Sequence, residues 1–226
     1  MEKKLVVFDC DGVLIDSEYV SSKVFAEALT ALGYSLTIEE SIRRFTGISA
    51  QAAREIIMKE SAIHIPENYW TLYQPRLSEV YETELKPLMI PVLQALKNLG
   101  IACCVASNSS RDYVIDCLKL TGQLSYFTEA SIFTAQQVSK GKPAPDLFLL
   151  AAREMGFAPE DCLVIEDSPP GIEAAFAAKM NVFAFLGGSH AHLDCYRAKI
   201  VEYGVPIMKD CSELIEAIHL SSQLVF

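Results

Sequence analysis

Short apolar runs alternate with stretches of helical periodicity over much of the chain. The clearest runs lie within the letters "KLVVFD", "GIACCVASN", "DCLVIEDS" and "NVFAFLG", and "ASIFTA" at residues 130–135 is a weaker one. Continuous apolar runs of this length are typical of strands buried on both faces of a parallel sheet. Helical patterns cover residues 90–98, 111–120, 145–155 and 170–179. The alternation predicts an α/β fold with a parallel sheet.

One long region lacks this alternation. From Ser17 to about Leu85 the chain contains amphipathic helical patterns such as "SSKVFAEALTALG" and "YWTLYQPRLSEVYETEL" but no clear buried strand. A connection of roughly 70 residues without structure of its own does not fit a compact domain. We therefore predict an inserted helical subdomain over residues 17–86, and a core formed by residues 1–16 and 87–226. Asp16 and Ser17 are expected to cap the first inserted helix.

Polar residues follow the predicted strands at the end where open parallel sheets bind their ligands. Several carboxylates at one such edge repel one another unless a divalent cation joins them, and an oxygen-rich set favours Mg²⁺. One carboxylate can attack phosphorus, a second can transfer the proton, and a lysine and a hydroxyl can hold the phosphoryl oxygens. The pattern indicates phosphoryl transfer. The residues in question are Asp9, Asp11, Ser107, Asn108, Lys142, Glu166 and Asp167.

Four segments, in order, resemble the motifs of the haloacid dehalogenase-like superfamily, and of its phosphatase and phosphoglucomutase-like branch in particular. They read "VVFDCDGVLIDSE", "VASNSS", "KGKPAPDLF" and "CLVIEDSPPGIEAA". The resemblance implies a Rossmann-like core with a helical cap inserted after the first motif, and Mg²⁺ as the cofactor. It agrees with the architecture that the apolar pattern predicts.

The resemblance also implies roles for individual residues. Asp9 would be the nucleophile and a Mg²⁺ ligand, and Asp11 the general acid/base, whose backbone carbonyl also binds the metal. Ser107 and the backbone of Asn108 would bind the phosphoryl group, and Lys142 would neutralise charge between nucleophile and phosphate.

The fourth motif and the cap supply the remaining candidates. The resemblance implies that Asp167 is a metal ligand and that Glu166 binds the metal or orients its waters. In the cap, Arg43 and Arg44 are candidates for contacting an anionic substrate group, with a solvated helix face as the alternative. "GGSHAH" at residues 187–192 follows the last predicted strand, and we interpret it as a flexible loop, with a place near the site as the alternative.

The branch of the superfamily is narrowed by particular positions. Dehalogenases lack an aspartate at the position of Asp11, so its presence favours phosphate chemistry. At the positions where β-phosphoglucomutases have a histidine, a lysine and an arginine in the cap, this chain has Ser21, Thr46 and Ala50, which weakens the mutase alternative. A non-catalytic binding module would have lost a key carboxylate. We expect a Mg²⁺-dependent phosphatase that acts on a small phosphomonoester, a sugar or sugar-acid phosphate.

Composition limits the partners. The net charge is −10, from 29 acidic and 19 basic residues, which argues against nucleic acid or an anionic membrane as a partner. The seven cysteines form no C-x-x-C pair and lie mostly in apolar runs, as expected for free thiols in a reducing compartment. Together with the lack of a membrane-spanning run, these features lead us to expect a cytoplasmic protein, a monomer or weak homodimer, that binds a small-molecule phosphate ester.

Overall fold

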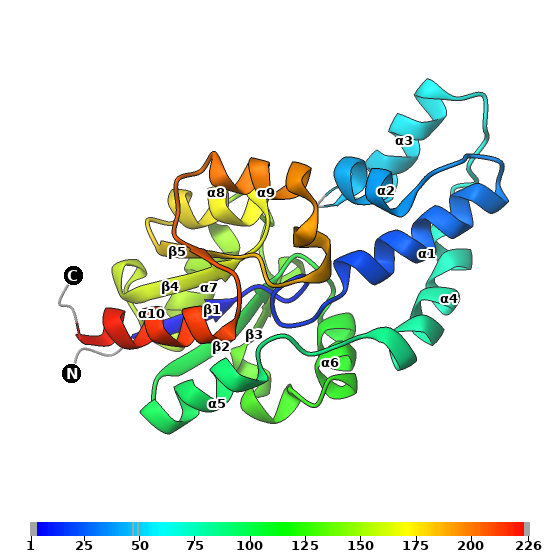
Figure 1. Cartoon of the computed structure of the whole chain (residues 1–226). Coiled ribbons are helices and arrows are strands. Elements are labelled where there is room, and N and C mark those ends of the chain that lie inside the picture. The colour runs from blue at the N-terminus through cyan, green and yellow to red at the C-terminus, as the bar shows by residue number, and fades with distance from the viewer. Residues whose placement is uncertain (1–3, 47, 49, 224–226) are drawn as a thin grey trace. The chain divides into compact units, whose positions relative to one another are not determined.

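The chain forms two compact units. The computed structural model describes residues 4–46, 48 and 50–223. The core unit comprises the described residues up to Asp16 and from Lys86 onward, and the cap unit comprises Ser17–Leu85 (Figure 1). The expected boundary after residue 86 differs by one position, because the Lys86 carbonyl accepts a hydrogen bond of 2.9 Å from the Asp16 N–H. Lys86 therefore belongs with the core unit.

A parallel sheet forms the centre of the core unit. Its order among the described residues is β3-β2-β1-β4-β5-β6, and every neighbouring pair is parallel. The α/β class predicted from the apolar runs is confirmed. Only β6 was not anticipated, because two residues are too few to give a pattern. The strands are β1 (Leu5–Phe8), β2 (Ala102–Ser107), β3 (Ile132–Thr134), β4 (Cys162–Glu166), β5 (Asn181–Phe185) and β6 (Ile207–Met208).

Helices follow the strands and cover the sheet. Right-handed crossovers place the connections of β1 to β2 and of β4 to β5 on opposite faces, because the two run toward opposite edges. In agreement, α5 contacts α10, and α7 contacts α8. The helices of the core unit are α5 (Ile90–Leu99), α6 (Arg111–Leu120), α7 (Asp146–Met155), α8 (Pro169–Ala177), α9 (Asp194–Val201) and α10 (Cys211–Gln223).

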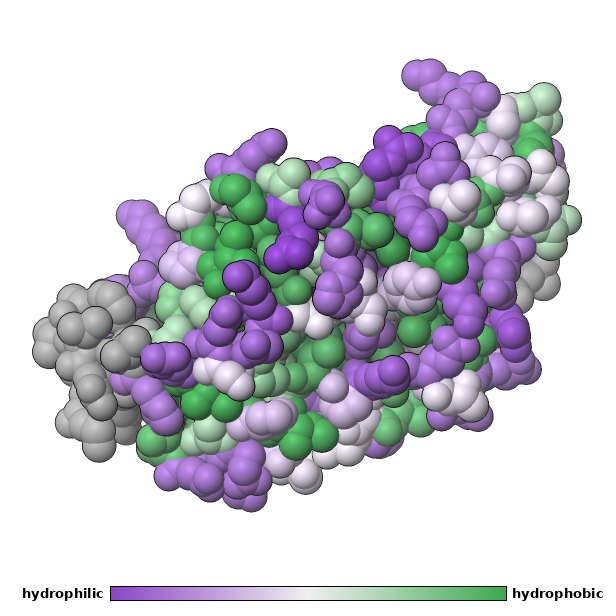
Figure 2. All heavy atoms as spheres, viewed as in Figure 1, coloured by the Kyte–Doolittle hydropathy of each residue, from purple (hydrophilic) through white to green (hydrophobic). Residues whose placement is uncertain are grey.

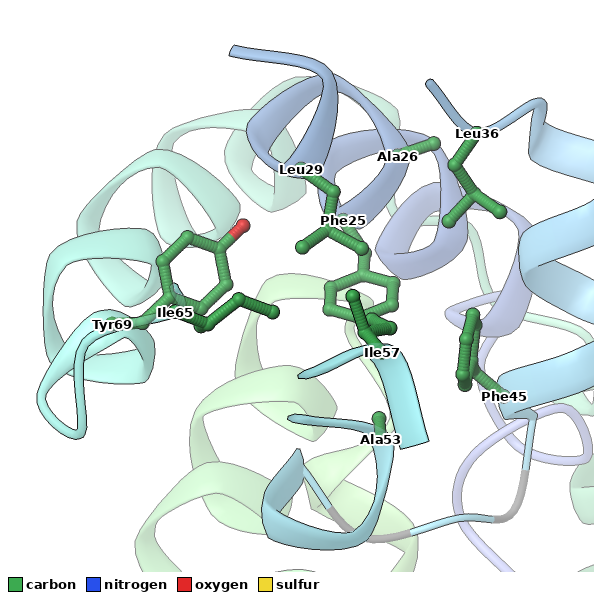
Figure 3. Packing of buried hydrophobic residues seen from close by; sticks show 9 residues of the cluster. All are labelled: Phe25, Ala26, Leu29, Leu36, Phe45, Ala53, Ile57, Ile65 and Tyr69. Carbon is green, nitrogen blue, oxygen red and sulfur yellow. The ribbon is translucent and has the colours of Figure 1, made fainter. Parts of the chain in front are cut away.

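The cap unit is helical and has its own apolar core. Its helices are α1 (Glu18–Ala31), α2 (Ile38–Phe45), α3 (Ala50–Glu60) and α4 (Tyr69–Glu84). The rings of Phe25 and Phe45 meet edge to face with centroids 5.6 Å apart, and seven further buried residues surround them (Figure 3). This cluster gives the insertion a folding core without a sheet.

The start of α1 differs from the expectation. Ser17 occupies the N-cap position, but its side chain makes no capping hydrogen bond. The carboxylate of Asp16 instead accepts a 2.8 Å hydrogen bond from the Ser189 backbone N–H and another from the Ser189 hydroxyl. Asp16 therefore ties the end of the first core segment to the loop after β5.

One face of the molecule is mixed in character (Figure 2). On the face shown in Figure 2, hydrophilic side chains are spread among hydrophobic ones. Each helix in the described part of the chain is too short or too polar to cross a lipid bilayer.

Candidate active site

The candidate site lies at the carboxyl ends of the central strands. In the register of the sheet, Phe8 of β1 stands beside Val105 of β2 and Ile165 of β4. Asp9 continues this ladder, since its N–H donates to the Ile165 carbonyl at 3.0 Å. Because the strands are parallel and end together, the first, second and fourth motifs meet at one edge of the sheet.

Lys142 joins two carboxylates in the interior of this edge. Its Nζ lies 2.6 Å from Asp9 Oδ1 and 2.7 Å from Glu166 Oε1, and only 3% of its side chain is exposed. The ring centroid of Phe148 lies 4.8 Å from the same nitrogen. An ammonium group buried in this way is stabilised because it faces two opposite charges at hydrogen-bond distance.

The side chain of Asn108 fixes the backbone at Lys142. Its amide nitrogen donates to the Lys142 carbonyl at 3.0 Å, and its amide oxygen accepts from the Lys142 N–H at 2.9 Å. The preceding residue has to be glycine, since a Cβ on Gly141 would lie 2.5 Å from Asn108 Oδ1. Sequence reasoning assigned Asn108 a backbone role; the structure adds a side-chain role in placing the lysine.

Three buried carboxylates converge beside Lys142. One oxygen from each of Asp9, Glu166 and Asp167 lies within 4.8 Å of the others. A set made only of carboxylate oxygens fits a hard cation such as Mg²⁺. Glu166 is the most occupied of the three, because its Oε2 also accepts from the Asp167 N–H at 2.9 Å and from the Ser168 N–H and hydroxyl at 3.0 and 2.9 Å. Glu166 thus holds the lysine and its own loop as well as facing the cluster.

The charges at the site do not balance. Burial raises the pKa of Asp9 well above its ordinary value, Lys142 opposes this, and Glu166 and Asp167 add to the rise. Burial likewise raises the pKa of Asp167, and Glu166 contributes to it. For Lys142 burial lowers the pKa, but the carboxylates of Asp9 and Glu166 outweigh burial and raise it. When ionised, the three carboxylates outnumber the one ammonium group of Lys142 in this cluster, and a divalent cation would compensate the difference.

Asp11 belongs to a second set of contacts at the same edge. Its Oδ1 accepts a 2.7 Å hydrogen bond from the Tyr113 hydroxyl, and its Oδ2 accepts a 2.8 Å hydrogen bond from the Ser109 hydroxyl. Ser107, which is buried, accepts a 3.0 Å hydrogen bond from the Ser109 N–H on its Oγ. The loop after β2 thus contacts the second aspartate of the first motif directly.

Comparison with known families identifies the class of protein. The sequence model of the haloacid dehalogenase-like hydrolases matches residues 6–185. The chain belongs to this family. The match covers the core unit from β1 to the end of β5 together with the inserted cap, and the resemblance stated from the four motifs is confirmed.

Similar proteins of this haloacid dehalogenase-like family include a 6-phosphogluconate phosphatase from Escherichia coli. It is 29% identical in an alignment of length 192 that covers 82% of this chain and 83% of that protein. A conserved haloacid dehalogenase-like protein of unknown function from Agrobacterium tumefaciens is 31% identical, with a TM-score of 0.84 over 97% of this chain and 99% of that one. A family hydrolase from Deinococcus radiodurans, solved with bound phosphate and sodium, is 27% identical, with a TM-score of 0.81 over 99% and 98% of the two chains.

Two residues contact Asp167 in this haloacid dehalogenase-like hydrolase: His190, whose segment had a place near the site only as the alternative interpretation, and Tyr196, which the sequence reasoning missed. The Nε2 of His190 lies 2.8 Å from Asp167 Oδ2, and the imidazole is fully buried. The Tyr196 ring meets the His190 ring edge to face, with centroids 4.7 Å apart. The Tyr196 hydroxyl donates to the Asp167 carbonyl at 3.2 Å. The segment interpreted as a flexible loop contains a short 3-10 helix, Ser189–His192, and it places His190 at the site. The signal was the histidine after a predicted strand end.

The arginines of the cap unit have contacts of their own. The Arg44 guanidinium pairs with Glu60, donates to the Tyr34 hydroxyl at 2.8 Å, and stacks 4.7 Å from the Phe45 ring centroid. Arg43 is exposed on α2. Both arginines belong to the cap unit and the carboxylate cluster belongs to the core unit, so a substrate contact from either arginine stays a prediction.

Proposed function

We propose that this protein is a Mg²⁺-dependent phosphatase that hydrolyses a small phosphomonoester, a sugar or sugar-acid phosphate, through an aspartyl-phosphate intermediate. The observation that carries the proposal is the arrangement of Asp9, held at 2.6 Å by Lys142, beside Glu166 and Asp167. The similarity to a 6-phosphogluconate phosphatase supports the substrate class. The hydrolase with bound phosphate supports the chemical group that is recognised.

Asp9 would act as the nucleophile. One of its carboxylate oxygens attacks phosphorus, the bond from phosphorus to the ester oxygen breaks, and the leaving oxygen takes a proton from Asp11. Asp11 then removes a proton from water, whose oxygen attacks phosphorus and releases inorganic phosphate and free Asp9. Lys142 would favour the ionised form of Asp9, and would also balance the phosphoryl charge together with the Ser107 hydroxyl and the Asn108 backbone N–H.

The metal would be held at the carboxylate cluster. Asp9 and Asp167 are the residues best placed to ligate it, the Asp11 carbonyl is a further candidate, and Glu166 would face it while holding Lys142. When bound, Mg²⁺ would offset the charge of the carboxylates and of the substrate phosphate.

A phosphate-release assay tests the proposal. Purified protein should release phosphate from 6-phosphogluconate or another phosphate of the sugar class with Mg²⁺ and not with EDTA. Asp9→Asn should abolish release, because the amide is not a nucleophile. Asp116→Asn is the matched control, since Asp116 lies on the surface of α6 and pairs with Lys119. Activity that survives Asp9→Asn would contradict the mechanism, and sugar-phosphate isomers formed without phosphate release would favour a mutase.

A further inference from the structure

We propose that Ser109 and Tyr113 are positioning residues that orient the Asp11 carboxyl group for proton transfer to the leaving oxygen. The proposal rests on the proposed function, since it assumes that Asp11 is the general acid. Its basis is that both oxygens of Asp11 accept hydrogen bonds, at 2.7 Å from Tyr113 and 2.8 Å from Ser109. Two donors on two oxygens define the plane of the carboxyl group, which one donor would leave free to turn.

The two donors come from a part of the chain that is itself fixed. Tyr113 lies in the first turn of α6, two residues after Arg111. The Arg111 guanidinium donates to the carbonyls of Ile132 at 2.6 Å and Glu129 at 2.7 Å, and its backbone N–H donates to Gln136 Oε1 at 3.0 Å. The start of α6 is thereby fastened to the segments on either side of β3, and the phenol is in place before substrate binds.

The second donor is fixed through Ser107 at the end of β2. The backbone N–H of Ser109 donates to Ser107 Oγ at 3.0 Å, while its hydroxyl reaches Asp11. One loop thus connects the residue proposed to hold the phosphoryl group with the residue proposed to move the proton. A shift of Asp11 by about 1 Å would reduce the rate roughly a hundredfold.

This role predicts a dependence on the leaving group. A nitrophenolate leaves without a proton, whereas the alkoxide of a sugar or glycerol phosphate needs one. Tyr113→Phe should therefore lower kcat/KM for the alkyl ester about 10- to 100-fold, the scale of general acid catalysis, and leave kcat/KM for p-nitrophenyl phosphate nearly unchanged. Ser109→Ala should also lower kcat/KM for the alkyl ester. Ser109→Thr, which keeps the hydroxyl, should restore kcat/KM for that ester to near the wild-type value.

Controls separate positioning from folding. Tyr203→Phe is the matched variant, because the Tyr203 hydroxyl donates to Glu173 Oε1 on the surface of the core unit. This substitution should leave kcat/KM unchanged for both esters. Three results with Tyr113→Phe would overturn the assignment: an equal loss of kcat/KM for both esters, no loss for either, or a gain for the alkyl ester. If Tyr113→Phe does not fold, the comparison of Ser109→Ala with Ser109→Thr decides. A wild-type protein inactive on both esters would instead overturn the proposed function, and this assignment with it.

Discussion

At the scale of single residues, the site is dominated by the shortage of positive charge around Asp9. Lys142 contacts Asp9 and Glu166, while Asp167 faces the same cluster from the loop after β4. Buried ions of one sign are costly unless each is paired. The cluster therefore lowers the stability of the metal-free protein and forms a place where a divalent cation would be stabilised.

This arrangement predicts a pH dependence for Asp167. Burial raises its folded-state pKa above an unfolded value of about 3.9. Its contribution to stability is thus fully present below about pH 4 and is lost as the pH rises through the folded-state pKa. In EDTA, the free energy of unfolding of wild type minus that of Asp167→Asn should fall with rising pH. Urea unfolding at a series of pH values measures this difference.

Adding Mg²⁺ supplies the second arm of the same experiment. At neutral pH, a hundredfold excess over Kd should stabilise wild type by about 2.7 kcal/mol and the Asp167→Asn variant by less, because a ligand is lost. In the EDTA series, the free energy of unfolding of wild type minus that of Asp167→Asn should fall with pH. A difference that stays constant or rises with pH would contradict the assigned direction of the Asp167 pKa.

At the scale of elements, the loop after β1 must pass unusually close to the loop after β4. Gly12 has a φ of +78°, and a Cβ there would lie 2.1 Å from Asp167 Oδ2 and 3.0 Å from His190 Cε1. Only glycine meets both demands, since other residues are strained at this φ and have no space for a side chain. The glycine of the first motif is therefore explained by packing against the fourth.

A pair of substitutions separates the two demands. Gly122 has a φ of +70° but no atom within 4 Å of an added Cβ, so Gly122→Ala should cost only the backbone strain, about 1 kcal/mol. Gly12→Ala should cost more and should also weaken Mg²⁺ binding, because Asp167 has to move. Unfolding and calorimetric titration measure the two effects. Equal losses of stability and unchanged Mg²⁺ affinity would contradict the packing argument.

At the scale of the whole molecule, the cap unit is inserted where the core unit already holds both ends. The Asp16 N–H donates to the Lys86 carbonyl at 2.9 Å, and the Leu88 N–H donates to the Leu14 carbonyl at 2.9 Å. Gln123 Nε2 also donates to the Leu14 carbonyl, at 2.9 Å. The points of exit and return are thus neighbours that do not depend on the insertion.

Removing the insertion should therefore leave a folded core. A chain in which Asp16 is joined to Lys86 by a short Gly-Ser linker should keep the sheet and bind Mg²⁺ with an affinity close to that of the full chain, because the carboxylate cluster lies in the core unit. Circular dichroism and calorimetric titration check this. An unfolded product, or one without Mg²⁺ affinity, would show that the core depends on the cap.

Much of the core fold followed from local patterns. The five longer strands could be predicted because they are apolar runs with polar residues directly after them. Strand β6 could not, since its two residues derive their conformation from pairing with β5. The helical nature of the insertion was likewise readable, whereas the ion pair of Arg44 with Glu60 joins α2 to the end of α3 and has no local signal.

By itself, the sequence determined which residues could carry phosphoryl chemistry, because the four motifs place their types and order along the chain. The tertiary structure alone decided their support: the Asn108 amide on the backbone of Lys142, the hydroxyls of Ser109 and Tyr113 on Asp11, and His190 against Asp167. Contacts of this kind join residues far apart in the chain. They depend on strand order and on the distances between loops, and neither is encoded in the spacing of a motif.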